Sequence, residues 1–240
     1  MHPLVDIQAV SKRYGAVQAL NQVSLQIGAG ERVAFVGANG SGKSTLLRAL
    51  VGLVRVQGRV LLAGVDVAKS PEIALRQVAY MPQVAPPLDV PVAELTKTIL
   101  SLRGVAPDRA SAIARQLGVD WDQVKGKALR DLSGGTKQKI LAAVALASQA
   151  PLLVCDEPTA NLDAAARDPF FELVRQRPAG SALVLCSHRR DEVAQLVDRV
   201  VELSEGVVLR DGPAGEVLAA AGSALWTRPQ GSPDGVEVHA

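Results

Sequence analysis

Hydrophobic and polar positions alternate along residues 4–36, with turn residues at Gly15, Gly28 and Gly30. This alternation has the period of two that is typical of half-buried strands. We therefore expect short antiparallel strands in the first part of the chain. A further short strand is predicted over residues 59–62, where the alternation resumes before a glycine turn.

The pattern then changes to the spacing of amphipathic helices. Residues 84–91 are rich in proline and predict a loop that leaves the first part of the fold. Helices are predicted over residues 92–103, over residues 107–117, and from about residue 133 to residue 149. These helices follow one another without a strand between them, which predicts a helical insertion.

Two continuous apolar runs follow, at residues 152–155 and 182–186. Such runs are typical of parallel strands that are covered on both faces. The pattern therefore predicts an α/β fold, with a mostly parallel core sheet, an N-terminal antiparallel β-subdomain and a helical subdomain inserted at about 84–150. We expect one domain over residues 1–221 and a disordered tail at 222–240, where Pro, Gly and Ser are frequent.

The segment from Gly37 to Ser44 reads Gly-Ala-Asn-Gly-Ser-Gly-Lys-Ser and fits the pattern of a phosphate-binding loop. An apolar run predicted as a strand precedes it, and a predicted helix over residues 46–51 follows. Free backbone amides and the start of a helix favour an anion at this place. Lys43 can bridge the β- and γ-phosphates, and the Ser44 hydroxyl can ligate Mg²⁺. The alternative, a glycine-rich turn that binds nothing, is disfavoured by the flanking strand and helix.

Two adjacent carboxylates, Asp156 and Glu157, follow the apolar run at 152–155. Burial of such a pair is costly unless something binds it, although an ordinary acidic strand end is the alternative. Beside a phosphate loop, Asp156 is expected to coordinate Mg²⁺ and Glu157 to orient the attacking water. His188 follows the run at 182–186, at an edge where ligands collect in such sheets. It is expected to bond the γ-phosphate or hold that water, with a structural histidine as the alternative.

A second phosphate site is predicted where Ser133, Gly134 and Gly135 precede a helix. Ser133 can simply cap that helix. Lys137 and Lys139, however, lie near its start, where positive charge opposes the helix dipole. A bound anion would reverse that effect, so the segment is a candidate for binding a γ-phosphate.

Composition limits the remaining possibilities. The chain has 240 residues, a net charge of +2 and 3% aromatic residues, so no nucleic-acid partner is expected. Cys155 and Cys186 lie in apolar runs and are expected to be reduced thiols of a cytosolic protein. Residues 140–155 form the longest uncharged stretch, which is too short to span a bilayer, and the N-terminus lacks the pattern of a secretion signal.

These motifs, in this order, resemble the ATP-binding subunit of an ABC transporter over about residues 4–215. Residues 160–163 resemble its D-loop, Gln83 its Q-loop and His188 its switch histidine. Thr136 departs from the usual Gln and resembles exporter-like subfamilies, including those tied to copper-enzyme maturation. The resemblance assigns ATP contacts to Tyr14, Gly37, Asn39, Gly40, Ser41, Gly42, Lys43, Ser44, Thr45, Gln83, Ser133, Gly134 and Gly135, metal contacts to Ser44, Gln83 and Asp156, and catalysis to Lys43, Glu157 and His188.

The resemblance implies a P-loop NTPase fold of the ABC cassette type, with ATP and Mg²⁺ as cofactors. It implies that a second ATP-binding subunit pairs head to tail with the first, as a homodimer, and that each signature segment closes over the other subunit's ATP. An integral membrane permease is the expected partner, on the cytoplasmic face of the membrane, and export is the expected direction. The alternatives are an ABC ATPase of a soluble assembly, such as copper-enzyme maturation, and a regulator without activity, which Glu157 and His188 disfavour.

Overall fold

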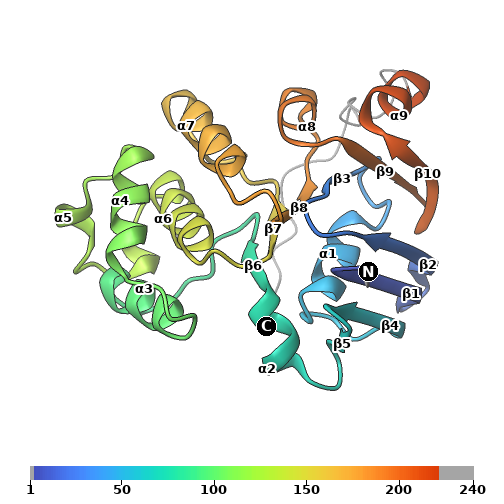
Figure 1. Ribbon diagram of the computed structural model, residues 1–240, viewed down its shortest axis with the longest axis horizontal. Coiled ribbons are helices and arrows are strands. Elements are labelled where there is room, and N and C mark those ends of the chain that lie inside the picture. The colour runs from blue at the N-terminus through green and yellow to red at the C-terminus, as the bar shows by residue number, and fades with distance from the viewer. Residues whose placement is uncertain (1–2, 222–240) are drawn as a thin grey trace.

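Two β-sheets organise the computed structural model, which describes residues 3–221 (Figure 1). A four-stranded antiparallel sheet has the order β2-β1-β4-β5, and a six-stranded sheet has the order β10-β9-β3-β8-β7-β6. The strands are β1 (Val5–Tyr14), β2 (Val17–Ile27), β3 (Arg32–Val36), β4 (Gln57–Leu62), β5 (Val65–Asp66), β6 (Val78–Met81), β7 (Leu152–Asp156), β8 (Ala182–Cys186), β9 (Arg199–Ser204) and β10 (Val207–Pro213). The antiparallel strands predicted for the first part of the chain are confirmed.

The larger sheet is parallel from β9 to β6, and β10 closes one edge as an antiparallel strand. Every residue of β7 and β8 is buried, as the continuous apolar runs predicted. The two strands are in register, so that Asp156 lies opposite Cys186. The segments that follow β7 and β8 therefore leave the sheet at the same edge, which brings the predicted catalytic groups together.

Helices flank this sheet and fill the interval between β6 and β7. They are α1 (Lys43–Leu50), α2 (Pro71–Ala74), α3 (Val92–Ser101), α4 (Asp108–Gln116), α5 (Trp121–Val124), α6 (Gly134–Ala147), α7 (Ala164–Arg175), α8 (Arg190–Leu196) and α9 (Ala214–Ala221), with short 3₁₀ turns at Leu75–Gln77 and Leu129–Asp131. Figure 1 shows α3 to α6 as a separate lobe, drawn in green, beside the parallel sheet. The predicted helices correspond to α1, α3, α4 and α6, whereas α2, α5, α7, α8 and α9 were not predicted.

The parallel sheet separates two apolar clusters. Strand β3 contributes Ala34 and Val36 to the cluster that contains the helical lobe, α7 and α8. Its other two inward residues, Val33 and Phe35, join the cluster formed with α1 and the antiparallel sheet. Alternate side chains of one strand thus anchor both apolar clusters.

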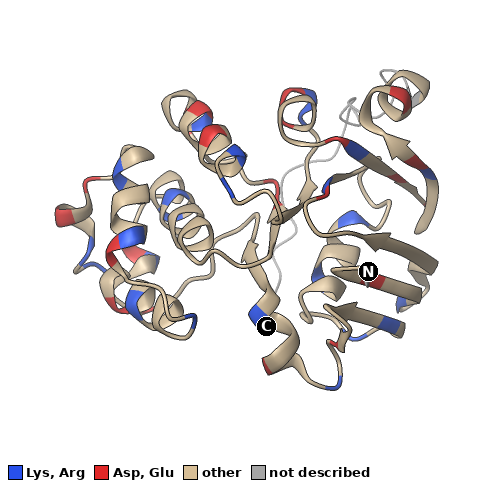
Figure 2. Ribbon diagram, viewed as in Figure 1, with Lys and Arg blue, Asp and Glu red and all other residues tan. Residues whose placement is uncertain are grey.

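Charged side chains of both signs are interspersed along the helices and strands (Figure 2). Between residues 3 and 221, every helix is too short or too polar to cross a bilayer. The bounds predicted for the domain and for the helical subdomain stay predictions. The predicted tail at 222–240 lies outside the described residues.

Candidate nucleotide-binding site

The phosphate loop connects β3 to α1 at the carboxyl edge of the parallel sheet. Gly42 precedes α1 with a φ of 104°, and among the described side chains none caps this helix. The first amides of α1 are therefore available to an anion, and the helix dipole favours negative charge there. Asn39, Ser44 and Thr45 lie in the same loop and in the first turn of α1.

Two glycines of this loop are required by close contacts. A Cβ atom on Gly37 would lie 2.2 Å from the carbonyl oxygen of Leu203, and one on Gly42 would lie 2.4 Å from the carbonyl oxygen of Ala19. Gly40 differs, because no described atom lies within 4 Å of its hypothetical Cβ, although its φ of 83° also favours glycine. The loop thus has its shape imposed by the strands around it at two points.

Lys43 is held over the loop by backbone oxygens. Its Nζ atom donates hydrogen bonds of 2.8 Å to the carbonyl oxygens of Gly37 and Ala38, and it lies 3.4 Å from the Ser41 hydroxyl. The ammonium group is therefore held beside the amides that would surround a phosphate. A phosphate chain in the loop would meet a positive charge that is already in position.

Asp156 ends β7 beside the loop and is only 2% exposed. Its Oδ1 atom has no hydrogen-bond partner in the part of the chain that the structure describes. Burial raises the pKa of this carboxyl group, against the lowering effect of hydrogen bonds from Cys186 and Ser44. An orphaned buried carboxylate oxygen beside a serine hydroxyl fits a hard divalent cation such as Mg²⁺.

Glu157 and His188 form a pair at the same edge. The Oε2 atom of Glu157 lies 2.7 Å from Nδ1 of His188, and the side chains are 10% and 50% exposed, respectively. The Glu157 backbone has a φ of 49°, and its N–H donates to the carbonyl oxygen of Cys186 at 2.8 Å. Such a conformation is uncommon for a residue other than glycine, and here it accompanies the direction in which the Glu157 side chain leaves the end of β7.

The signature segment caps α6. The Ser133 hydroxyl accepts from the N–H of Thr136 at 3.2 Å and lies 2.8 Å from the Thr136 hydroxyl. Lys139, which we expected to reflect a bound anion, instead pairs with Asp163 at 2.7 Å. That part of the expectation is wrong, because a carboxylate of the protein already compensates the charge of Lys139.

The structure does not bring the two predicted phosphate sites together. Figure 1 shows α6, which begins at Gly134, in the green lobe, and α1, which follows the phosphate loop, on the far side of the central strands. The two predicted phosphate sites therefore lie in different parts of the described chain (Figure 1).

Gln83 and Tyr14 lie at the margins of the site. The backbone oxygen of Gln83 accepts a 3.5 Å hydrogen bond from Asn161, and its side chain is exposed just beyond β6. Tyr14, at the end of β1, is 45% exposed, and the Lys12 ammonium lies 4.9 Å from the centre of its ring. The structure leaves both side chains accessible.

Two buried polar contacts were not predicted from the sequence. The Thr159 hydroxyl donates to Oε1 of Glu192, and both residues are fully buried. Gln138, which is 1% exposed, donates from Nε2 to the carbonyl oxygens of Pro82 and Pro158 at 3.2 and 3.5 Å. In the sequence, these contacts could have been suspected only from Glu192, which falls on the apolar face of a short helix, and from Gln138, which falls in an otherwise apolar helix.

A comparison with protein families matches residues 20–160 to the family described as ABC transporter. The chain belongs to this family. The match begins in β2 and continues beyond the end of β7, so it includes the phosphate loop, the signature segment and the two carboxylates. The ABC cassette fold expected from the sequence is confirmed.

Among the relatives of this ABC cassette, a putative ABC transporter ATP-binding protein of Streptomyces avermitilis is 38% identical over 229 residues, covering 92% of this chain and 40% of that protein. A lipoprotein-releasing system ATP-binding protein of Anaeromyxobacter dehalogenans is 36% identical over 88% of this chain and 95% of its own length. A zinc import ATP-binding protein of Roseobacter denitrificans is 37% identical over 88% of this chain and 79% of its own length. The chain thus spans about two fifths of the Streptomyces relative.

Solved structures agree. The structure of an ATP-binding subunit of an ABC transporter matches with a TM-score of 0.80 and 25% identity over 94% of this chain and 95% of that chain. A dimeric ATP-binding cassette in a post-hydrolysis state, bound to ADP and phosphate, matches in fold with a TM-score of 0.76 and 24% identity over 88% of this chain and 98% of its own. The chain therefore has the fold of the ATP-hydrolysing cassette.

Proposed function

We propose that this chain is an ATP-hydrolysing subunit that drives a separate integral membrane permease and works as a homodimer. The observation that carries the proposal is the Glu157–His188 pair, which lies beside the orphaned carboxylate of Asp156 at the phosphate-loop edge. A binding module without activity has no need of a nearly buried carboxylate that is held by an imidazole. A carboxylate positioned in this way can orient the attacking water and accept its proton.

Each residue then has a separate task. The amides of the phosphate loop and Lys43 bind the β- and γ-phosphate oxygens, and Lys43 neutralises charge that develops on the transferred phosphoryl group. Glu157 orients the attacking water and takes its proton through Oε1, since Oε2 is occupied by His188. His188 holds Glu157 in place.

Asp156 and the Ser44 hydroxyl would hold Mg²⁺, with Gln83 as a further ligand. When bound, the ion would neutralise phosphate charge and fix the orientation of the triphosphate. Tyr14 would stack on adenine, because its ring is accessible and it pairs with Val17 of β2, the strand whose Ala19 carbonyl oxygen lies beside Gly42 of the loop.

The homodimer accounts for the separation between the phosphate loop and the signature segment. In a head-to-tail pair, Ser133, Gly134 and Gly135 of one copy would cover the γ-phosphate in the loop of the other. A solved structure of the same fold is dimeric and bound to ADP and phosphate, which supports dimer formation. Binding of ATP would close the pair, and hydrolysis would release it.

Transport direction is part of the proposal. The sequence favours export, but relatives of this chain are named for zinc import as well as for lipoprotein release. Import is therefore the second candidate, and an ATPase of a soluble assembly is the third. In the first two cases the chain would lie on the cytoplasmic face of the membrane.

Dimer formation provides the first test. The Glu157→Gln variant, incubated with ATP and Mg²⁺, should double in mass by light scattering, whereas the Glu157→Gln/Ser133→Ala double variant should stay largely monomeric. A monomer at saturating ATP in the Glu157→Gln variant would contradict the shared site. Matched samples with ADP provide the control.

The membrane partner requires a separate experiment. The tagged chain is purified from detergent-solubilised membranes and from the soluble fraction of the same cells, and its partners are identified by mass spectrometry. A polytopic membrane protein in stoichiometric amount is the expected result. Stoichiometric recovery with soluble proteins alone would favour the soluble assembly.

A further inference from the structure

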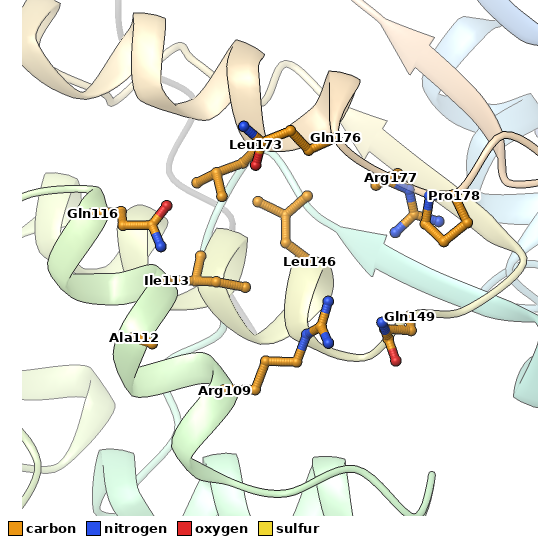
Figure 3. Close-up of a pocket in the computed structure, with 10 residues that line it drawn as sticks. All are labelled: Arg109, Ala112, Ile113, Gln116, Leu146, Gln149, Leu173, Gln176, Arg177 and Pro178. Carbon is orange, nitrogen blue, oxygen red and sulfur yellow. The ribbon is translucent and has the colours of Figure 1, made fainter.

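A pocket unrelated to the phosphate loop lies between the helical lobe and α7. It has a volume of about 270 Å³ and is lined by α4, by the end of α6 and by the end of α7. Figure 3 shows Arg109, Ile113, Leu146, Gln149, Leu173 and Arg177 around a common space. The parts of the chain that meet here are far from one another in sequence.

Arg177 forms the buried side of this pocket and lacks a counter-charge. It is 8% exposed, and the only hydrogen bond of its side chain among residues 3–221 runs from Nη2 to the carbonyl oxygen of Ala150. Nη1 is buried and has no partner in that part of the chain. Burial lowers the pKa of this guanidinium, and no carboxylate contributes to the shift. A buried cation in this state is costly for the fold unless an anion joins it.

Arg109 supplies a second positive charge at the mouth of the pocket. With its amide oxygen turned toward Arg109, Gln149 accepts from Nη1 and Nη2 at 2.9 Å each. Two N–H groups of Arg109 thus converge on one neutral oxygen, which is the place that a carboxylate would occupy more favourably. The acid closest in sequence to Arg177, Glu172, is already engaged with Arg175 and Gln176.

The remaining walls combine apolar side chains with neutral glutamines, and none of the residues that line the pocket is acidic. The volume lies just below the range of drug-sized sites, which limits an occupant to a small molecule. The pocket thus offers an unpartnered nitrogen of Arg177, the guanidinium of Arg109 and apolar side chains between them. This combination suits a small apolar molecule that carries a single anionic group.

We propose that the pocket between α4, α6 and α7 binds a small organic carboxylate, which Arg177 and Arg109 hold together. The carboxylate would lie between the two guanidinium groups, and its apolar part would contact Ile113, Leu146 and Leu173. Because α4 and α6 belong to the helical lobe and α7 follows a strand of the core, the ligand would join the lobe to the core.

Thermal unfolding of the full chain, without nucleotide, tests this proposal. Sodium butyrate and sodium benzoate are titrated against sodium chloride and sodium sulfate at equal ionic strength. We expect at least one carboxylate to raise Tm saturably, by about 2–4 °C at five times its dissociation constant. An equal rise in Tm with chloride or sulfate would overturn the proposal. The absence of a rise with either carboxylate would also overturn it, and would indicate that the pocket holds only water.

Variants assign the response to the pocket. Arg177→Met and Arg109→Gln should each abolish the Tm rise, whereas Arg175→Met, which changes an exposed arginine at the end of α7, two residues before Arg177, should keep it. A rise that survives in folded Arg109→Gln would overturn the proposal, even if Arg177→Met does not fold. The Lys43→Ala variant should keep the rise, so failure at the phosphate loop and failure at this pocket can be told apart.

Discussion

The Nδ1 atom of His188 lies 2.7 Å from Oε2 of Glu157, and this contact joins the carboxyl ends of the neighbouring strands β7 and β8. The glutamate is nearly buried and the histidine is half exposed. One oxygen of the carboxylate is therefore fixed by the protein, and the other remains available to a water molecule. The fold positions this pair before any nucleotide arrives.

Replacement of Glu157 by Gln should lower ATP turnover by about 10²- to 10⁴-fold, because the amide cannot accept the proton of the attacking water. Affinity for ATP should stay within a few fold, since the phosphate loop is unchanged. Phosphate release and calorimetric titration with ATP provide the two measurements. Turnover equal to that of the unmodified chain would remove Glu157 from the catalytic role.

The glycines of the phosphate loop should differ in their tolerance of a methyl group. Gly37→Ala places Cβ 2.2 Å from the oxygen of Leu203, so we expect a loss of about 3 kcal/mol or more in the free energy of unfolding. Gly40→Ala meets open space and should lose about 1–2 kcal/mol from its backbone conformation alone. Urea denaturation of both variants makes the comparison, and equal losses would contradict the steric explanation.

Tyr14 should contribute to affinity for ATP through its ring. Tyr14→Ala is expected to weaken ATP binding by about 1–3 kcal/mol, the range measured when bases lose an aromatic stacking partner. Tyr14→Phe keeps the ring and should retain most of the affinity. Binding of inorganic triphosphate, which has no base, should be equal in all three proteins, and a parallel loss there would point to a change in the loop instead.

Glu192 should make stability depend on pH. Burial raises the pKa of Glu192 from 4.5 to about 7, and the negative charges of Glu157 and Asp191 add to the rise. The hydrogen bond with Ser187 and the positive charge of Arg189 lower the pKa and so oppose it. The folded protein therefore binds this proton more tightly than the unfolded chain does. The free energy of unfolding should fall between pH 4.5 and 7 and then level off.

Glu192→Gln should remove this decline and, above pH 7, stabilise the protein by about 1–3 kcal/mol, provided that the amide keeps the contact with Thr159. Denaturation at a series of pH values gives the profile. Asp191→Asn is the matched control on the same helix, because Arg189 lowers the pKa of Asp191 and its contribution to stability is lost as pH falls. An unchanged decline in Glu192→Gln would assign it to another group.

Much of the fold follows from local patterns, and what does not follow has identifiable causes. Alternating hydrophobic and polar positions predicted the antiparallel strands, and continuous apolar runs predicted β7 and β8. Both patterns can be read from a single segment, because they depend only on which faces of one strand are buried. Helix α7 was missed because Pro169 interrupts it, which removes a helical hydrogen bond. The helix forms nonetheless because Phe170 and Phe171 bury their rings in the core.

The candidate site shows the same division. The phosphate loop could be predicted because all of its groups are neighbours in sequence. The contact between Thr159 and Glu192 could not, since it joins residues that only the packing of α8 brings together. The pairing of Lys139 with Asp163 was missed for the same reason, and it removed one argument for an anion at the signature segment.

Gln138 has a consequence for how the two halves of the molecule can move. From the first turns of α6, its amide binds the segment that leaves β6 and the segment that follows β7. A rotation of the helical lobe would have to break these two hydrogen bonds or carry both segments along with it. One glutamine thus ties the lobe to the core by polar bonds that can be exchanged, in addition to the apolar cluster that the lobe shares with the parallel sheet.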